Sequence, residues 1–188
     1  MDTWIVIALA LAIVVFFGIL LYNRLVALRE SRKSAFSDID VQLKLRHDLV
    51  PNLVETVKGY ASHEKELFEN VTQARANAQH AESVNDKIRA EGAFGQALYN
   101  LFAVAENYPE LRASDNFQRL QSELTDVEHK ISSARRFFNN ATNEYNTAAQ
   151  QFPANLMAGF FGFAKEPFFE LADQERKHIE AAPEVKFN

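Results

Sequence analysis

The stretch FQRLQSELTDVEHKISSARRFFNNATNEYNTA, residues 117–148, carries the clearest evidence for the fold class of this chain. Its apolar side chains recur in alternating steps of three and four residues, the spacing of a helix packed in a left-handed bundle. We predict one long amphipathic helix that begins after Ser114, a good N-cap residue. It should end before Phe152 and Pro153, because proline disfavours helical geometry in the residue before it. The seam positions are Phe117, Leu120, Leu124, Val127, Ile131, Ala134, Phe138, Ala141, Tyr145 and Ala148.

A second run with the same spacing extends from Phe36 to Ala78. It continues in register across Pro51, and the surrounding HDLVPNLV holds no Gly or Ser of the kind that turns recruit. A kinked but continuous helix is therefore favoured over the alternative, a hairpin at Pro51. The first plausible turn is SVNDK, from Ser83, and a shorter helix should follow at about residues 86–107.

An uncharged apolar segment, WIVIALALAIVVFFGILL, occupies residues 4–21. A helix needs roughly 20 such residues to cross a bilayer core. Trp4 and Tyr22 lie at its two ends, where aromatic rings favour the headgroup level. A cleaved signal peptide would have a basic region before the apolar run and a small-residue site after it, and this chain has neither. We predict a retained transmembrane helix at residues 4–22, after a short tail at residues 1–3.

The charges that flank this segment predict its orientation. None precedes it except Asp2, whereas a basic cluster follows it, and basic flanks tend to stay in the cytoplasm. We therefore expect the N-terminus outside and the remainder of the chain in the cytoplasm. The alternative is that these charges only solvate a helix. The predicted anchor and topology residues are Trp4, Tyr22, Arg24, Arg29, Arg32 and Lys33.

Composition limits both the fold and the partners. The 188 residues include only 6 Gly and 5 Pro, little material for the turns of an all-β fold. The prediction is an all-α chain, in which a single N-terminal transmembrane helix precedes an antiparallel, up-and-down bundle of three to four long, coiled-coil-like helices at residues 23–151. A net charge of -5 argues against nucleic-acid partners, and the absence of cysteine excludes disulfides and thiolate metal sites.

The pattern changes after the predicted bundle, in residues 152–188. Residues 152–169 hold six of the 16 phenylalanines and two closely spaced glycines, too interrupted to span a membrane again. One interpretation is a small helix and loop packed across the end of the bundle. The other is an exposed apolar patch for self-assembly or for lying among lipid headgroups. The candidate patch residues are Phe160, Phe161, Phe163, Phe168 and Phe169, and a charged tail follows at residues 172–188.

Two charged residues, Arg46 and Glu64, fall on the apolar seam of the second run, where a buried unpaired charge would cost several kcal/mol. They could pair inside the bundle or reach water. Alternatively, they could surround the carbonyl freed by the proline and form a polar docking point for another subunit or protein. The candidate docking residues are Arg46, His47, Asp48, Pro51, Asn52 and Glu64.

No pattern in the chain predicts catalysis. The only Glu-x-x-His is Glu175 with His178, and a di-iron bundle needs two such motifs. Phosphate-binding Gly-x-x-x-x-Gly-Lys loops and Gly-x-Ser-x-Gly elbows are absent. We therefore expect no catalytic residues, no metal, no cofactor and no small-molecule substrate.

The chain resembles the LemA family of bacterial membrane proteins along nearly its full length. The resemblance rests on the order of anchor and basic flank and on four motifs: RHDLVPNLVETVKGYA within residues 22–64, AENYPELRASDNFQRLQSEL from Ala105, SSARRFFNNATNEYN from Ser132, and FPANLMAGFFGF from Phe152. It implies a membrane-anchored helical bundle with most of the chain in the cytoplasm, and it implies no established reaction.

These observations together predict a membrane-anchored, non-catalytic scaffold or assembly protein. Its partners would be the lipid bilayer, through residues 4–22, and further copies of itself or other membrane proteins. The first rival is a membrane-surface sensor or remodelling module that uses the Phe-rich segment. The second is an enzyme of unrecognised type, which would need a polar pocket where the seams carry Leu, Phe and Val.

Overall fold

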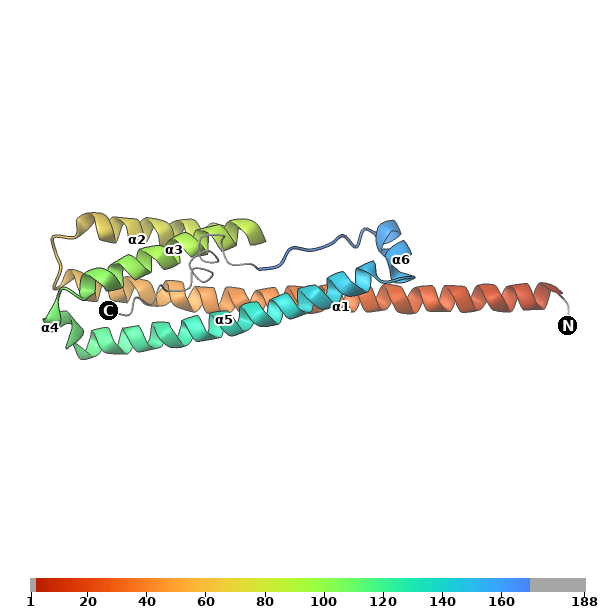
Figure 1. Ribbon diagram of the computed structural model, residues 1–188, viewed down its shortest axis with the longest axis horizontal. Coiled ribbons are helices and arrows are strands. Elements are labelled where there is room, and N and C mark those ends of the chain that lie inside the picture. The colour runs from red at the N-terminus through yellow and green to blue at the C-terminus, as the bar shows by residue number, and fades with distance from the viewer. Residues whose placement is uncertain (1–2, 170–188) are drawn as a thin grey trace, which may run out of the picture. The chain divides into compact units, whose positions relative to one another are not determined.

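The computed structural model describes residues 3–169, and all regular structure in that range is helical (Figure 1). This confirms the predicted all-α class, with a long apolar N-terminal helix followed by further helices. The charged tail predicted at residues 172–188 lies outside the described residues. The helices are α1 (Thr3–Lys58), α2 (Lys65–Gln79), α3 (Val84–Ala105), α4 (Pro109–Arg112), α5 (Asp115–Gln150) and α6 (Ala154–Phe161).

Helix α1 passes through Pro51 without a break, so the prediction of a continuous helix at this residue is confirmed. The prediction that the same helix reaches Ala78 is wrong, because α1 ends at Lys58 and α2 begins only at Lys65. Gly59 follows the last helical residue, and glycine is about 1 kcal/mol less favourable than alanine in a helix. The apolar period continues across this turn because α1 and α2 both face one core. The period therefore shows which residues are buried, and it does not show that they belong to one continuous helix.

The other helix boundaries follow local sequence signals. The Ser83 hydroxyl accepts a hydrogen bond from the backbone N–H of Asp86 at 3.0 Å, which caps α3 at the predicted turn. Helix α3 begins and ends two residues earlier than expected. Helix α5 begins directly after Ser114 and ends at Gln150, as the seam predicted.

The described residues form two compact units. The first unit contains residues 3–40 and 132–168, and the second contains residues 41–131 together with Phe169. In the second unit, α1, α2, α3, α4 and α5 contribute to one core. Its buried residues are Val50, Leu53, Val54, Val57, Ala61, Phe68, Val71, Ala78, Phe94, Leu98, Leu101, Ala105, Leu111, Phe117, Leu120 and Leu124.

The first unit contains α6 and the segment that follows it. Gly162 ends α6 with a φ of 72°, a left-handed conformation that favours glycine. The backbone N–H of Phe163 donates to the carbonyl of Ala158 at 2.9 Å, so the helix closes in a Schellman motif. Beyond this turn, residues 163–168 run without helical structure, and we call them the strap. The core here contains Leu25, Tyr145, Ala148, Ala149, Ala158 and Phe163.

Candidate functional site

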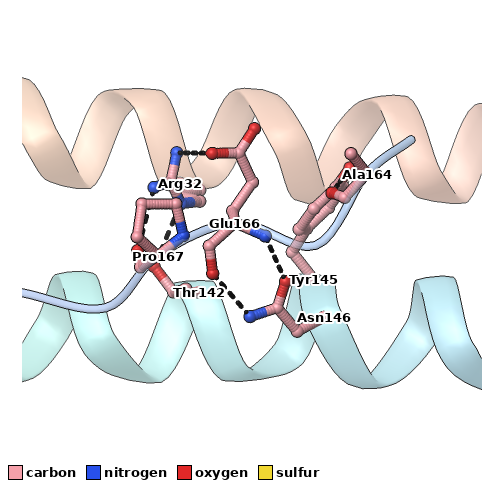
Figure 2. Close-up of polar contacts among 7 residues, drawn as sticks. All are labelled: Arg32, Thr142, Tyr145, Asn146, Ala164, Glu166 and Pro167. Carbon is pink, nitrogen blue, oxygen red and sulfur yellow. Dashed lines mark hydrogen bonds and ion pairs between the residues drawn. The ribbon is translucent and has the colours of Figure 1, made fainter. Parts of the chain in front are cut away.

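The strap is held between α1 and α5 by side chains from both helices (Figure 2). Asn146, buried on α5, pairs with the backbone of Glu166 through both ends of its amide. Its Nδ2 donates to the Glu166 carbonyl, and its Oδ1 accepts from the Glu166 N–H, each at 2.9 Å. The Tyr145 hydroxyl donates to the carbonyl of Ala164 at 3.0 Å. These bonds reach backbone atoms, so they hold an extended chain in one register.

Arg32 on α1 completes this set of contacts, which we call the clasp. Its Nη1 lies 3.2 Å from a carboxylate oxygen of Glu166, and its Nη2 donates to the carbonyl of Pro167 at 3.1 Å. Its Nε donates to the hydroxyl of Thr142 on α5 at 3.1 Å, and the guanidinium lies over the ring of Phe138. One buried cation therefore joins α1, α5 and the strap.

Burial changes the titration of two clasp residues. It lowers the pKa of the Arg32 guanidinium, while the negative charge of Glu166 opposes that shift. It also raises the pKa of the Tyr145 hydroxyl, and Glu166 raises it further, so the hydroxyl keeps the proton that it donates to the strap.

Arg32 was predicted as part of the basic flank, and the clasp was not predicted. A signal was available, because Thr142 and Asn146 lie four residues apart on either side of the seam residue Tyr145. Polar residues at that spacing form a stripe on one helix face, and both prove to be buried.

A second polar cluster lies in the second unit, around Glu91 of α3. The Glu91 carboxylate forms an ion pair with Arg46 of α1, and its Oε1 lies 2.9 Å from Nε2 of His47. Arg46 also contacts Glu128 of α5 at 2.7 Å. The side chains of Glu91, Arg46 and His47 are at most 6% exposed, and Phe94 covers the arginine and the imidazole. Three helices are thus joined by buried charge.

The charges of this cluster set the titration of its carboxylate. Burial alone would raise the pKa of Glu91, but the hydrogen bond to His47 and the positive charge of Arg46 outweigh it. The pKa of Glu91 is therefore below its ordinary value, and the group stays ionised at neutral pH. Glu91 was absent from the predicted residues, although it lies three residues before Phe94, a residue of the buried core.

The other predicted docking residues occupy different surroundings. The carbonyl of His47, freed by Pro51, accepts a hydrogen bond from Nε of Arg75 on α2 at 2.7 Å. Asp48 is exposed and pairs with a neighbouring lysine on α1. Pro51 and Asn52 are exposed on the same helix, and Glu64 is half-buried at the start of α2. The structure therefore brings Arg46 and His47 together, and leaves Asp48, Pro51 and Asn52 at the surface.

The predicted anchor residues lie along the first part of α1. Among the described residues, α1 is the one helix long and apolar enough to cross a membrane, and none of its most apolar 18-residue window is buried. Trp4 is exposed near its start. Tyr22 makes edge contacts with Phe161 and Phe163, with ring centroids 5.0 and 5.6 Å away. The end of the apolar segment is therefore in contact with α6 and the strap.

The residues of the basic flank differ in their roles. Arg24 is exposed, and Lys33 forms an exposed ion pair with Glu30 at 2.7 Å. The guanidinium of Arg29 lies 4.9 Å from the ring centroid of Phe163. Only part of the flank is therefore free to interact with headgroups or solvent.

The Phe-rich residues divide into buried and exposed groups. Phe163 and Phe169 are buried, and Phe168 is half-buried. Phe160 is 84% exposed and Phe161 is 48% exposed, both on α6. Within residues 3–169, no group of three or more His, Asp or Glu side chains is placed to hold a metal ion.

Comparison with known proteins identifies similar chains. The profile of the LemA family matches residues 35–187. Magnetosome protein MamQ of Magnetospirillum gryphiswaldense is 26% identical over 187 residues, which cover 85% of this chain and 69% of the relative. Magnetosome protein MamQ 2 of Paramagnetospirillum magneticum is 26% identical over 188 residues, with the same coverage. Protein LemA of Metamycoplasma hominis is 21% identical over 165 residues, covering 85% of this chain and 74% of the relative.

Proposed function

This chain belongs to the LemA family, and from that premise we propose that it is a single-pass, membrane-anchored scaffold without catalytic activity. Its helical region would assemble with further copies or with other membrane proteins. The observation that carries the proposal is the continuity of α1, which leads from an exposed apolar segment into the helical region without a break. In the proposed topology, at a bacterial inner membrane, the N-terminus is outside and the helical region is cytoplasmic.

The use of buried polar groups supports a non-catalytic role. Arg46, His47 and Glu91 contact one another in the interior of the second unit, and Arg32 is engaged by Glu166 and the strap. A catalytic group must be within reach of a substrate, whereas these groups are buried and join helices. The names of the similar proteins, which refer to magnetosomes and to LemA, state no reaction.

The surface beside the Glu91 cluster is the proposed docking point. Asp48, Pro51 and Asn52 are exposed on consecutive turns of α1. The ion pair of Arg46 with Glu91 and the hydrogen bond from Arg75 hold this part of the helix in place. A rigid polar surface of this kind loses little conformational entropy when a partner binds.

The proposal is tested by the mass of the full-length protein extracted in mild detergent. Light scattering, corrected for bound detergent, should give a protein mass at least twice the 21.4 kDa of one chain, or a stable complex with other membrane proteins. A single 21.4 kDa chain without bound protein would contradict the scaffold role.

The absence of cysteine from the chain allows a second, site-directed test. Asn52→Cys places one thiol on the proposed docking surface, and Glu66→Cys places one on the exposed side of α2 as a matched control. Crosslinking in isolated membranes should capture a partner or second copy from position 52 more efficiently than from position 66. Equal or absent crosslinking from both positions would remove the docking role from this surface.

A further inference from the structure

Helix α6 carries large apolar side chains that nothing in its unit covers. Its sequence, ANLMAGFF, contains no charged residue. Leu156 and Phe160 lie one turn apart and are 66% and 84% exposed, and Phe152, just before the helix, is 80% exposed. We call these three residues the α6 stripe. A lone exposed apolar residue is ordinary, but three neighbouring ones on one short segment indicate an interaction surface.

The opposite side of α6 fixes its position along α1. Ala158 is buried in the same core as Leu25, which lies four residues after the end of the apolar segment at Leu21. Met157 lies against Gly18, because a Cβ added at Gly18 would be 3.9 Å from the terminal methyl of Met157. With the ring contact between Phe161 and Tyr22, α6 lies at the level of the last turn of the predicted membrane span.

That level is where a spanning helix passes from acyl chains to headgroups. The side chains of α1 at this level, including Phe17 and Leu20, are exposed and apolar like the stripe. Whatever medium surrounds the span therefore also reaches α6. Arg24 is two residues after Tyr22, and Lys165 is two residues after Phe163, whose ring contacts Tyr22. Both cations are exposed, so they are available to lipid phosphates near this level.

We propose that the α6 stripe inserts into the boundary between headgroups and acyl chains, in the leaflet that surrounds the C-terminal end of the span. Helix α6 would lie at the membrane surface as an interfacial helix beside the transmembrane helix, with its other side packed on α1. Such helices bind by burying apolar side chains to a depth of about 5–10 Å. This inference rests on the proposed membrane anchor but not on the scaffold role, because a monomer would have the same contact with lipid.

The test uses full-length protein reconstituted in vesicles of phosphatidylcholine and phosphatidylglycerol. Leu156→Cys and Phe160→Cys are made separately and labelled with a polarity-sensitive fluorophore, so each checks the other. Ser34→Cys is the control, because it is a conservative change at an exposed site of α1, twelve residues or about 18 Å along the helix from Tyr22. Circular dichroism confirms that each labelled variant keeps its helical content.

Lipids with a nitroxide high on the acyl chain should quench about half of the fluorescence at positions 156 and 160, as expected for an interfacial depth. The label at position 34 should keep its fluorescence with these lipids and be quenched by aqueous iodide instead. Equal iodide quenching at all three positions would overturn the proposal. Disulfide formation between two unlabelled copies of Leu156→Cys, together with a lack of lipid quenching in the labelled variant, would overturn it as well and assign the stripe to a second copy.

Discussion

Replacing Glu91 by Gln should destabilise the second unit strongly. The substitution keeps the shape of the side chain but removes the charge that Arg46 and His47 face, at a site where Glu91 is 1% exposed. Breaking a buried ion pair costs about 3–5 kcal/mol, because the remaining charge stays buried without compensation. Arg46 keeps its contact with Glu128 at 2.7 Å, so the lower end of that range applies.

A loss of about 3 kcal/mol corresponds to a decrease in Tm of about 6–12 °C for a chain of this size. Thermal unfolding is followed by circular dichroism at 222 nm on the full-length protein in mild detergent, where the apolar span contributes a constant background. Glu123→Gln is the matched control. It removes the same charge from an exposed pair with Arg119, and exposed pairs contribute about 0–1 kcal/mol.

A second variant tests the cause of the effect. Arg46→Met combined with Glu91→Leu removes both buried charges, and replacing a whole buried pair by apolar side chains is often neutral. The double variant should therefore regain most of the lost stability, while the half-exposed Glu128 turns to water. The reasoning is refuted if Glu91→Gln melts within the range of Glu123→Gln, because the cluster would then be hydrated.

Four further outcomes are expected. The pKa of Glu91 is lowered in the folded state, so its stabilising contribution is complete above a pH of about 4.5 and should decrease as the pH falls further. The free energy of unfolding of Glu91→Gln should therefore depend less on pH in the acid range than that of the unmodified protein. Pro51→Ala should leave Tm unchanged or raise it, since proline inside a helix costs hydrogen bonding, and a large drop would contradict this. Asn146→Ala leaves a backbone N–H and a carbonyl of the strap unpaired, so hydrogen exchange of residues 163–168 should accelerate. Neutral residues in place of Arg24 and Lys33, with lysines added at the N-terminus, should produce mixed or reversed orientation of a C-terminal reporter, and an unchanged orientation would contradict charge-directed topology.

Prediction from sequence succeeded where the residues that determine a helix or a turn lie within the same short stretch of chain. Helix α5 has one uninterrupted seam, a serine before its first residue and a proline after its last turn, and its observed bounds match. The turn at Ser83 is closed by a hydrogen bond to Asp86, only three residues away. The apolar segment at the start of α1 needs no partner to be recognised, because length and hydrophobicity suffice.

Prediction failed where one pattern fits two arrangements. The seam from Phe36 to Ala78 is compatible with one helix or with two helices that face the same core, and the turn after Lys58 distinguishes them. Gly59 was the available signal, although a single glycine inside a helical pattern is weak evidence. The role of Arg32 was missed for a related reason, since a basic residue near a membrane span has an explanation that requires no partner.

The amino-acid sequence by itself determined that this chain is helical, where its longest amphipathic helix lies and which segment can cross a membrane. These properties depend on neighbours within a few turns, whose spacing can be read directly. Only the tertiary structure decided which buried charges meet and what holds the strap. Arg46 and Glu91 are 45 residues apart, and Arg32 and Pro167 are 135 apart. Periodicity records that a face is buried, but the residue that lies opposite depends on how distant helices pack.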